Sequence, residues 1–300
     1  MTNFHYPLPE SEPSSPWSGL SDEARTALSR VAVGPSVANQ LLQPHGLVNP
    51  EISLDFQSVV SEARQNYGNT LINTGTGISI PEITSSEFSE VDWQRLELGY
   101  KAYELLLGMS PELVITPEGQ PISFWKSLYG NLREWQGINN PDSPHRLKKQ
   151  DDGDGLYIDN QVADHWDQLT PDRLSWGVTV VPTISDTPSL NVDYEGKDEN
   201  GDISTELTHV LAGLGHTGLY HPSVERYLML QATRLQSGQE PVDSKTYTWL
   251  NGNFTNSENN QVAPRGRWFP GSGQVYLAWR KVGIRGDNLG VRPEVRGQDL

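Results

Sequence analysis

Three histidines lie close together in the chain and could hold a metal ion. His209, His216 and His221 fall within thirteen residues, and imidazole is a common ligand for zinc and other transition metals. Their spacings of seven and five residues match no compact metal motif, and the glycines between them predict a loop. His221 precedes Pro222, which is typical of the start of a helix. We therefore expect no metal at these residues.

An acidic segment resembles a calcium-binding loop only in part. Gln-Asp-Asp-Gly-Asp-Gly (150–155) places Asp152, Asp154 and Gly155 at the third, fifth and sixth positions of an EF-hand loop. The first and twelfth positions would be Gln150 and Gln161, so two carboxylate ligands are missing. A looser oxygen site on this loop is the alternative, and the acidic turn at 193–202 is expected to be a solvated loop. The sequence thus predicts no metal and no other cofactor.

The chain lacks the usual signatures of nucleophilic catalysis. It has no cysteine, no Gly-x-Ser-x-Gly elbow, no phosphate loop and no dinucleotide fingerprint. Gly271-Ser-Gly273 has the wrong spacing for an elbow and precedes an apolar segment, so it predicts a turn. We therefore expect a protein that is not an enzyme.

Aromatic, arginine and amide residues near the C-terminus could form a recognition surface. Val275, Leu277 and Trp279 alternate with Tyr276 and Ala278, which predicts a strand with one buried face that includes Trp279. Such residue types supply stacking area, paired hydrogen-bond donors and adaptable amides. An ordinary surface with structural arginines is the alternative, and Trp268 could instead belong to the core. The residues that we assign to the exposed face and its loops are Arg267, Trp268, Tyr276, Arg280, Arg285, Asp287 and Asn288.

Helical and strand patterns divide the chain into two halves. Helical periodicity occurs at 54–67, at 92–107 and after Pro121, and again from Pro222 to Gly238. Apolar runs at 174–182, 190–194, 247–254, 263–268 and 274–280 predict strands. The expected class is α+β, with a helical N-terminal half and a small twisted antiparallel sheet in the C-terminal half. The predicted units are a Pro/Ser-rich arm (1–20), a mainly helical attachment region (21–150) and a binding module (151–300).

The last fifty residues carry a resemblance to a known fold. Tyr-Thr-Trp-Leu-Asn-Gly-Asn-Phe (247–254), Ala-Pro-Arg-Gly-Arg-Trp (263–268) and Leu-Gly-Val-Arg (289–292) follow one another, separated by loops. This order resembles the end of the C-type-lectin-like fold in the branch of formylglycine-generating enzymes and retroelement variable proteins. Arg292 and Arg296 are expected to close the fold by packing and hydrogen bonding.

The resemblance implies binding rather than catalysis. Formylglycine-generating enzymes use a cysteine-held copper ion, and related sulfoxide synthases use a three-histidine iron site, usually with His-x-x-x-His spacing. This chain has no cysteine and no such spacing. In the retroelement variable proteins, the corresponding strands and loops hold the ligand-contacting positions, which agrees with the surface assigned above.

Charge and hydropathy exclude two kinds of partner. The net charge is −16, but residues 261–300 have seven Lys/Arg and three Asp/Glu, so that the other 260 residues carry −20. An acidic bulk argues against nucleic acid, which requires a basic footprint. No apolar run is long enough to span a membrane, and no signal peptide is expected.

Together these features predict a non-enzymatic binding protein that recognises a receptor protein or glycan on a target cell. It would form part of a phage tail, baseplate or injection-system particle, as a homo-oligomer among neighbouring subunits, in a virion or extracellular particle. A structural particle component that uses the module as a subunit contact is the alternative. An enzyme of the formylglycine-generating superfamily is the third reading.

Overall fold

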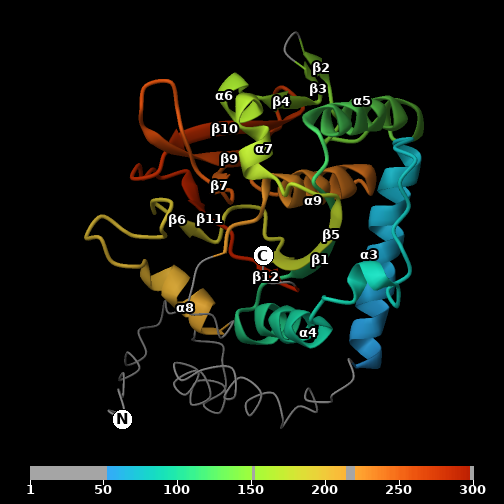
Figure 1. The fold of residues 1–300 in the computed structure, drawn as a ribbon, viewed down its shortest axis with the longest axis horizontal. Coiled ribbons are helices and arrows are strands. Elements are labelled where there is room, and N and C mark those ends of the chain that lie inside the picture. Colours follow the sequence, from blue (N-terminus) through green and yellow to red (C-terminus); the bar gives the residue numbers. More distant parts are fainter. Residues whose placement is uncertain (1–52, 151–152, 214–219, 298–300) are drawn as a thin grey trace.

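The computed structural model describes residues 53–150, 153–213 and 220–297 as a mixed α/β protein (Figure 1). The predicted arm (1–20) and the rest of 1–52 lie outside these residues. The helices are α3 (Leu54–Asn73), α4 (Trp93–Lys101), α5 (Ile122–Asn139), α6 (Asn160–Asp164), α7 (Trp166–Leu169), α8 (Thr205–Gly213) and α9 (Val224–Gln236), with a 3₁₀ turn (Ser86–Phe88) and a π turn (Ala102–Leu106). The strands are β1 (Pro111–Glu118), β2 (Lys149–Gln150), β3 (Gly153–Asp154), β4 (Leu156–Ile158), β5 (Ser175–Pro182), β6 (Ser189–Leu190), β7 (Tyr247–Trp249), β8 (Phe254–Thr255), β9 (Gln261–Phe269), β10 (Gln274–Lys281), β11 (Leu289–Val291) and β12 (Val295–Arg296).

The larger sheet is built around the long antiparallel hairpin β9–β10. Its strand order within the described residues is β4-β10-β9-β7-β11-β6, and β8 adds to β9. The pairs β4–β10 and β7–β11 are parallel, whereas β7–β9 and β6–β11 are antiparallel. The hairpin turns at Pro270–Gly273, where Gly273 has a φ of 62° and donates to the carbonyl of Phe269. Gly271-Ser-Gly273 is therefore a turn, as predicted.

The smaller sheet joins the two halves of the sequence. Its order is β1-β5-β12, and all eight residues of β1 pair with β5 from Pro111↔Pro182 to Glu118↔Ser175. Strand β1 was not predicted, because the whole region 21–150 was expected to be mainly helical. One apolar core cluster also extends from Phe56 to Val295. Hydrogen bonds and core packing thus cross residue 150, where the boundary between the two units was predicted.

Helix α9 lies between the two sheets in the centre of the fold (Figure 1). Ser223 caps its first turn by accepting from the amide of Arg226, and Gly238 follows its end with a φ of 75°. Only Arg234 and Gln236 of its residues escape full burial. At Gly266 on β9, an added Cβ would lie 2.3 Å from the ring of Tyr227, so only glycine allows this close approach of strand and helix.

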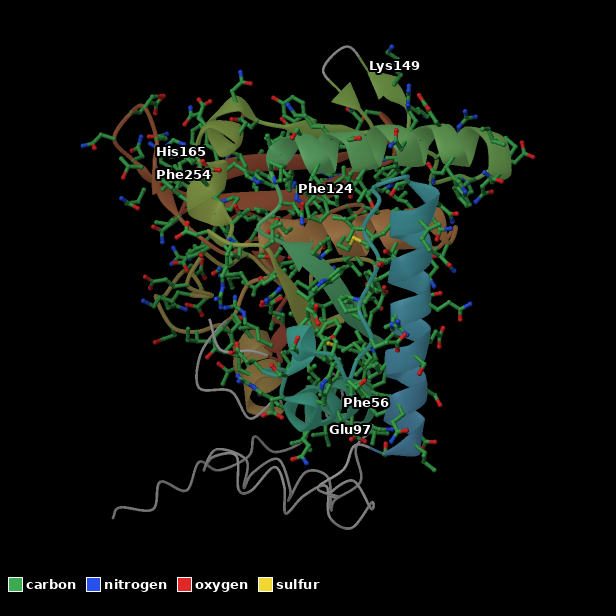
Figure 2. All side chains as sticks on the ribbon, turned by 45° about the vertical axis from the view of Figure 1, so that its right-hand side comes forward. Phe56, Glu97, Phe124, Lys149, His165 and Phe254 are labelled. Atoms are coloured by element: carbon green, nitrogen blue, oxygen red, sulfur yellow. The ribbon has the colours of Figure 1, made fainter. Side chains whose placement is uncertain are left out.

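Most predicted elements are confirmed, with changes at their ends. The helix predicted at 54–67 extends from Leu54 to Asn73, and its Ser53 cap is bonded to Glu97, which holds α4 against its start (Figure 2). The helix predicted at 92–107 forms as α4 and then widens into the π turn. The strand predicted at 190–194 is shorter, because Asn191 has a φ of 57° and ends β6. No helix among the described residues has the length and apolar character needed to cross a bilayer.

Buried ion pairs join the C-terminal residues to the rest of the fold. Arg226 on α9 donates to Glu118 at 2.6 Å and to Glu294 at 2.8 Å, and Arg296 donates to the same oxygen of Glu294 at 2.6 Å. Arg292 donates to Asp243 at 2.7 Å, and both side chains are fully buried. The predicted packing and hydrogen bonding of Arg292 and Arg296 are therefore confirmed.

Glu225 should make the stability of the fold depend on pH. Burial raises its pKa from 4.5 to about 7, although the amides of Gly119 and Gln120 donate to it and oppose the shift. A raised pKa means that the folded state favours the neutral acid. The contribution of Glu225 to the free energy of unfolding is therefore complete below pH 4.5 and is lost as the pH rises through 7. The difference of about 2.5 pKa units corresponds to roughly 3 kcal/mol. We expect the parent chain to lose this amount relative to Glu225→Gln between pH 4.5 and 8 in urea unfolding. Parallel pH profiles of the two chains would contradict the prediction.

Candidate binding face

The outward positions of the hairpin β9–β10 carry aromatic and arginine side chains. On β9, Arg265, Arg267 and Phe269 are partly exposed while Gly266 and Trp268 between them are buried. This alternation follows from the pleat of a strand, which points successive side chains to opposite faces. The inward face packs on the core with α9, and the outward face is the side on which the predicted recognition surface was placed.

The strand register brings residues from four strands together on this outward face. Tyr276 on β10 lies opposite Arg267 on β9 and opposite Tyr157 on β4. Tyr247 on β7 comes into contact with both arginines of β9. We call this surface the aromatic–arginine face, and its members are Tyr157, Tyr247, Arg265, Arg267, Phe269, Tyr276 and Arg280.

The rings and guanidinium groups of the face stack on one another. Tyr157 and Tyr276 are parallel, with their ring centroids 4.3 Å apart and an interplanar angle of 7°. Arg265 lies 4.0 Å above the ring of Tyr247, and Arg267 lies 4.4 Å above that of Phe269. Stacking holds a guanidinium plane in place and costs little of its capacity to donate hydrogen bonds from its edge. The face is therefore preorganised before any ligand arrives.

The arginines of the face have no carboxylate partner among the described residues. Arg267 donates to the carbonyl of Ser244 at 3.1 Å, while the buried Nε atoms of Arg265 and Arg267 lack a hydrogen-bond partner. Burial lowers the pKa of Arg265, as do the neighbouring charges of Arg280 and Arg267, against the opposite effect of Tyr247 and Tyr276. Guanidinium groups crowded without anions leave a local positive charge on a protein whose net charge is −16. An anionic group would be stabilised there.

The structure brings three of the seven predicted site residues together on the face. These are Arg267, Tyr276 and Arg280. Trp268 was placed on this surface incorrectly: it is 0% exposed and belongs to the core cluster on the inward side of β9. The physical reason is the strand pleat, because Arg267 and its neighbour Trp268 must point to opposite faces. Trp279, predicted to be core, is partly buried and packs against the core cluster.

The other three predicted residues lie in the loop between β10 and β11. Arg285 donates to Asp193 at 2.6 Å and to the carbonyl of Lys197 at 2.8 Å, so it holds the acidic turn at 193–202 in place. Asp287 and Asn288 are exposed, and the Asn288 carbonyl accepts from the amide of Tyr247 at 2.6 Å. None of the three stacks on a member of the face, and Arg285 has a structural role.

Four members of the face were missed from the sequence. Arg265 and Phe269 follow directly from the pleat, since they lie two residues on either side of Arg267. Tyr247 lies on the predicted strand at 247–254, but its contact with β9 depends on tertiary pairing. No sequence pattern indicated that Tyr157 belongs to the face, because the parallel pairing of β4 with β10 joins residues far apart in the chain.

The metal candidates do not form a site within the described residues. No group of three or more histidine and carboxylate side chains converges there. Burial lowers the pKa of His221 to about 4, its Nε2 bonds to the carbonyl of Tyr194 at 2.8 Å, and its ring stacks on that tyrosine. His216, Asp151 and Asp152 lie outside the described residues, as does the side chain of Asp154. In the second acidic turn, Asp193 and Asp198 accept from backbone amides of the turn itself.

A second pair of stacked rings lies beside the hairpin, where His165 and Phe254 have centroids 4.3 Å apart (Figure 2). The ring of His165 also bonds to the carbonyl of Gln161 at 2.8 Å, which makes it part of the local structure.

No family model matches the chain, and neither curated proteins nor solved structures gave a match. The interpretation of the face therefore depends on its own geometry.

Proposed function

We propose that the chain is a binding protein that recognises its partner through the aromatic–arginine face. The observation that carries the proposal is the set of three arginines without carboxylate partners, two of them stacked on rings of a rigid sheet. Arginine and tyrosine on a preorganised surface contribute strongly to binding energy when the partner excludes water. The partner is a receptor protein or glycan that presents a carboxylate, sulfate or phosphate group to this face.

The C-type-lectin-like character of the C-terminal half is part of this proposal. It is supported by the order of β5, α9, β7, the hairpin β9–β10 and the closing strands β11 and β12. Arg292 ends the Leu-Gly-Val-Arg segment and Arg296 follows it, and both are buried in ion pairs, in keeping with the resemblance of that segment. By this resemblance, the face lies on the strands that hold the ligand-contacting positions in the retroelement variable proteins.

A second candidate function uses the same surface as a contact between subunits of a particle. The charge distribution favours it, because residues 261–300 carry +4 and the remaining 260 residues carry −20. The positive face of one copy could therefore meet an acidic surface of another. Both candidate functions, recognition of a target and assembly of a phage-like or injection-system particle, use the same residues of the face. They differ only in the partner that the face binds.

The double variant Arg267→Ala/Arg280→Ala tests both candidates. We expect it to bind at least about a hundredfold more weakly than the parent to carboxylated or sulfated sugars on a glycan array, because two bidentate donors are lost. The melting temperature should stay close to that of the parent. The matched control Lys126→Ala/Arg173→Ala removes two exposed positive charges elsewhere and should bind as the parent does.

Oligomeric state separates the two candidates. If the parent binds no sugar but forms an oligomer that the double variant cannot form, the face is a subunit contact. If the double variant retains both the sugar binding and the oligomeric state of the parent, the proposed function is wrong.

A further inference from the structure

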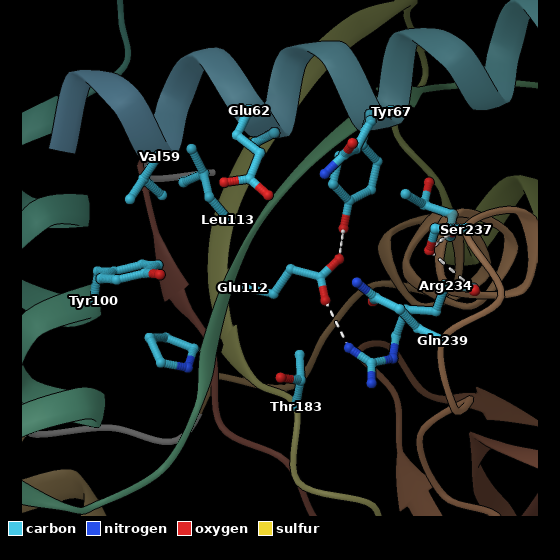
Figure 3. Close-up of a pocket in the computed structure, with 14 residues that line it drawn as sticks. Val59, Glu62, Tyr67, Tyr100, Glu112, Leu113, Thr183, Arg234, Ser237 and Gln239 are labelled. Atoms are coloured by element: carbon cyan, nitrogen blue, oxygen red, sulfur yellow. Dashed lines mark hydrogen bonds and ion pairs between the residues drawn. The ribbon is translucent and has the colours of Figure 1, made fainter. Parts of the chain in front are cut away.

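A pocket of about 310 Å³ lies away from the aromatic–arginine face, between α3, α4, β1 and α9 (Figure 3). This volume is at the lower end of the range for small-molecule sites. Val59, Leu113 and Pro111 form part of an apolar wall, and the ring of Tyr100 lines the same side. The opposite side is polar and includes Arg234 of α9 and Ser237, which caps the C-terminal end of that helix. The pocket shares no lining residue with the face, so what it binds is independent of the proposed function.

The polar centre of the pocket is fixed by internal hydrogen bonds. Glu112 accepts from the hydroxyl of Tyr67 at 2.7 Å and from Arg234 at 2.9 Å (Figure 3). Arg234 also donates its Nε to the carbonyl of Glu240 at 2.7 Å. The only arginine of the lining is thus already engaged by a carboxylate and a carbonyl. Because Glu112 neutralises the charge of Arg234, the described lining of the pocket has no free positive charge to attract an anionic ligand.

The opposite end of the pocket is negative. Glu62 projects into it from α3 and has no ion-pair partner among the described residues. Burial raises the pKa of Tyr100, and so do the charges of Glu104, Glu62 and Glu112, with no cation opposing them. An aromatic ring beside an unpaired carboxylate, here Glu62, is the environment that stabilises an ammonium group. A metal ion fits poorly, since no group of three or more metal-ligating side chains occurs in the described part of the chain.

One buried hydroxyl of the lining has no partner. Thr233 is 3% exposed, and its Oγ1 makes no hydrogen bond in the structure. A buried polar group without a partner costs free energy unless a ligand or water supplies the bond. From the cavity, the unpaired Glu62 beside Tyr100 and the unsatisfied Thr233, we infer that the pocket binds a small organic ammonium compound that carries a hydroxyl group. The ammonium group lies between Tyr100 and Glu62, and the Thr233 side chain turns its buried Oγ1 toward the pocket to bond with the ligand hydroxyl.

Choline and its neutral isostere 3,3-dimethylbutan-1-ol form the test, because they differ in one atom and its charge. Binding to the full chain is measured by calorimetry and by chemical-shift changes. We expect choline to bind at least about tenfold more tightly than the isostere, as a charge over an aromatic ring beside a carboxylate requires. Ethanolamine, which keeps the charge and the hydroxyl, distinguishes a primary from a quaternary ammonium ligand. Equal binding of choline and its isostere, or no binding of either choline or ethanolamine at roughly 10 mM, overturns the inference.

Variants assign the binding to this pocket. Glu62→Gln changes an exposed side chain and leaves the fold intact, so it should weaken choline binding about fivefold or more by loss of the charge. Tyr100→Leu should weaken it similarly, and Thr233→Val should weaken choline but not tetramethylammonium, which has no hydroxyl. Glu90→Gln removes an exposed carboxylate outside the pocket and should leave binding unchanged. If Glu62→Gln binds choline as the parent does, the site lies elsewhere and the inference is wrong.

Discussion

Arg292→Met should destabilise the fold by about 3–5 kcal/mol, which is a large part of the stability of an ordinary domain. Arg292 is fully buried and bonds to the carboxylate of Asp243 and to the carbonyls of Pro182 and Ile184. Methionine fills much of the same volume but cannot donate a hydrogen bond. The carboxylate of Asp243 would then remain buried without a counter-charge. Urea unfolding followed by far-ultraviolet circular dichroism measures the loss.

Two further variants show that the loss comes from the unpaired charge. Adding Asp243→Asn to Arg292→Met removes the buried charge and should recover part of the lost stability, since Thr187 still donates to this side chain. Arg64→Met is the exposed counterpart: Arg64 bonds to Glu82 and to the carbonyl of Pro81 at the surface. It should cost no more than about 1 kcal/mol. Equal losses in Arg292→Met and Arg64→Met would contradict the assignment of the buried pair as the cause.

The elements that local patterns determine were predicted well. Pro121 and Pro222 indicated the starts of α5 and α9, and the alternation from Val275 to Trp279 indicated β10. These signals act within a few residues, through capping groups and side-chain periodicity, so that they are visible without the fold. Hydrogen bonding by Arg292 and Arg296 was also predicted, from their place in the terminal segment that begins Leu-Gly-Val-Arg.

The features that depend on distant pairing could not be predicted. Strand β1 reads Pro-Glu-Leu-Val-Ile-Thr-Pro-Glu, a short apolar run between two helices, and only its full-length pairing with β5 makes it a strand. Tyr157 reaches the face through a parallel pairing with β10. The pocket combines residues from four elements. For each of these, the deciding contact joins segments that are far apart in the sequence.

The face itself was found from composition and then corrected by geometry. Arginine and aromatic residues marked the right region, but composition alone does not say which side of a strand each residue occupies. The pleat divides β9 into an outward set, Arg265, Arg267 and Phe269, and an inward set that includes Gly266 and Trp268. Arg285 was drawn into the predicted site by its type alone, whereas it serves to hold the turn at Asp193.

The burial of Trp268 leads to the second large prediction. Trp268→Ala should cost about 3–5 kcal/mol, because it removes a large side chain from the core and leaves a cavity. Far-ultraviolet circular dichroism in urea is the measurement, since the loss of a tryptophan changes the fluorescence signal itself. The variant should weaken binding at the face only in so far as it unfolds the chain.

Trp268→Phe distinguishes packing from any direct role of the indole. The indole N–H of Trp268 is buried without a hydrogen-bond partner, so phenylalanine removes an unsatisfied donor while keeping most of the apolar volume. Its cost should therefore stay below about 2 kcal/mol, well under that of alanine. A loss under about 1 kcal/mol in Trp268→Ala, together with weakened binding in a fully folded chain, would return Trp268 to the exposed surface where the sequence alone had placed it. With Trp268 in the core, the binding energy of the face must come from the arginines and rings of its outward positions.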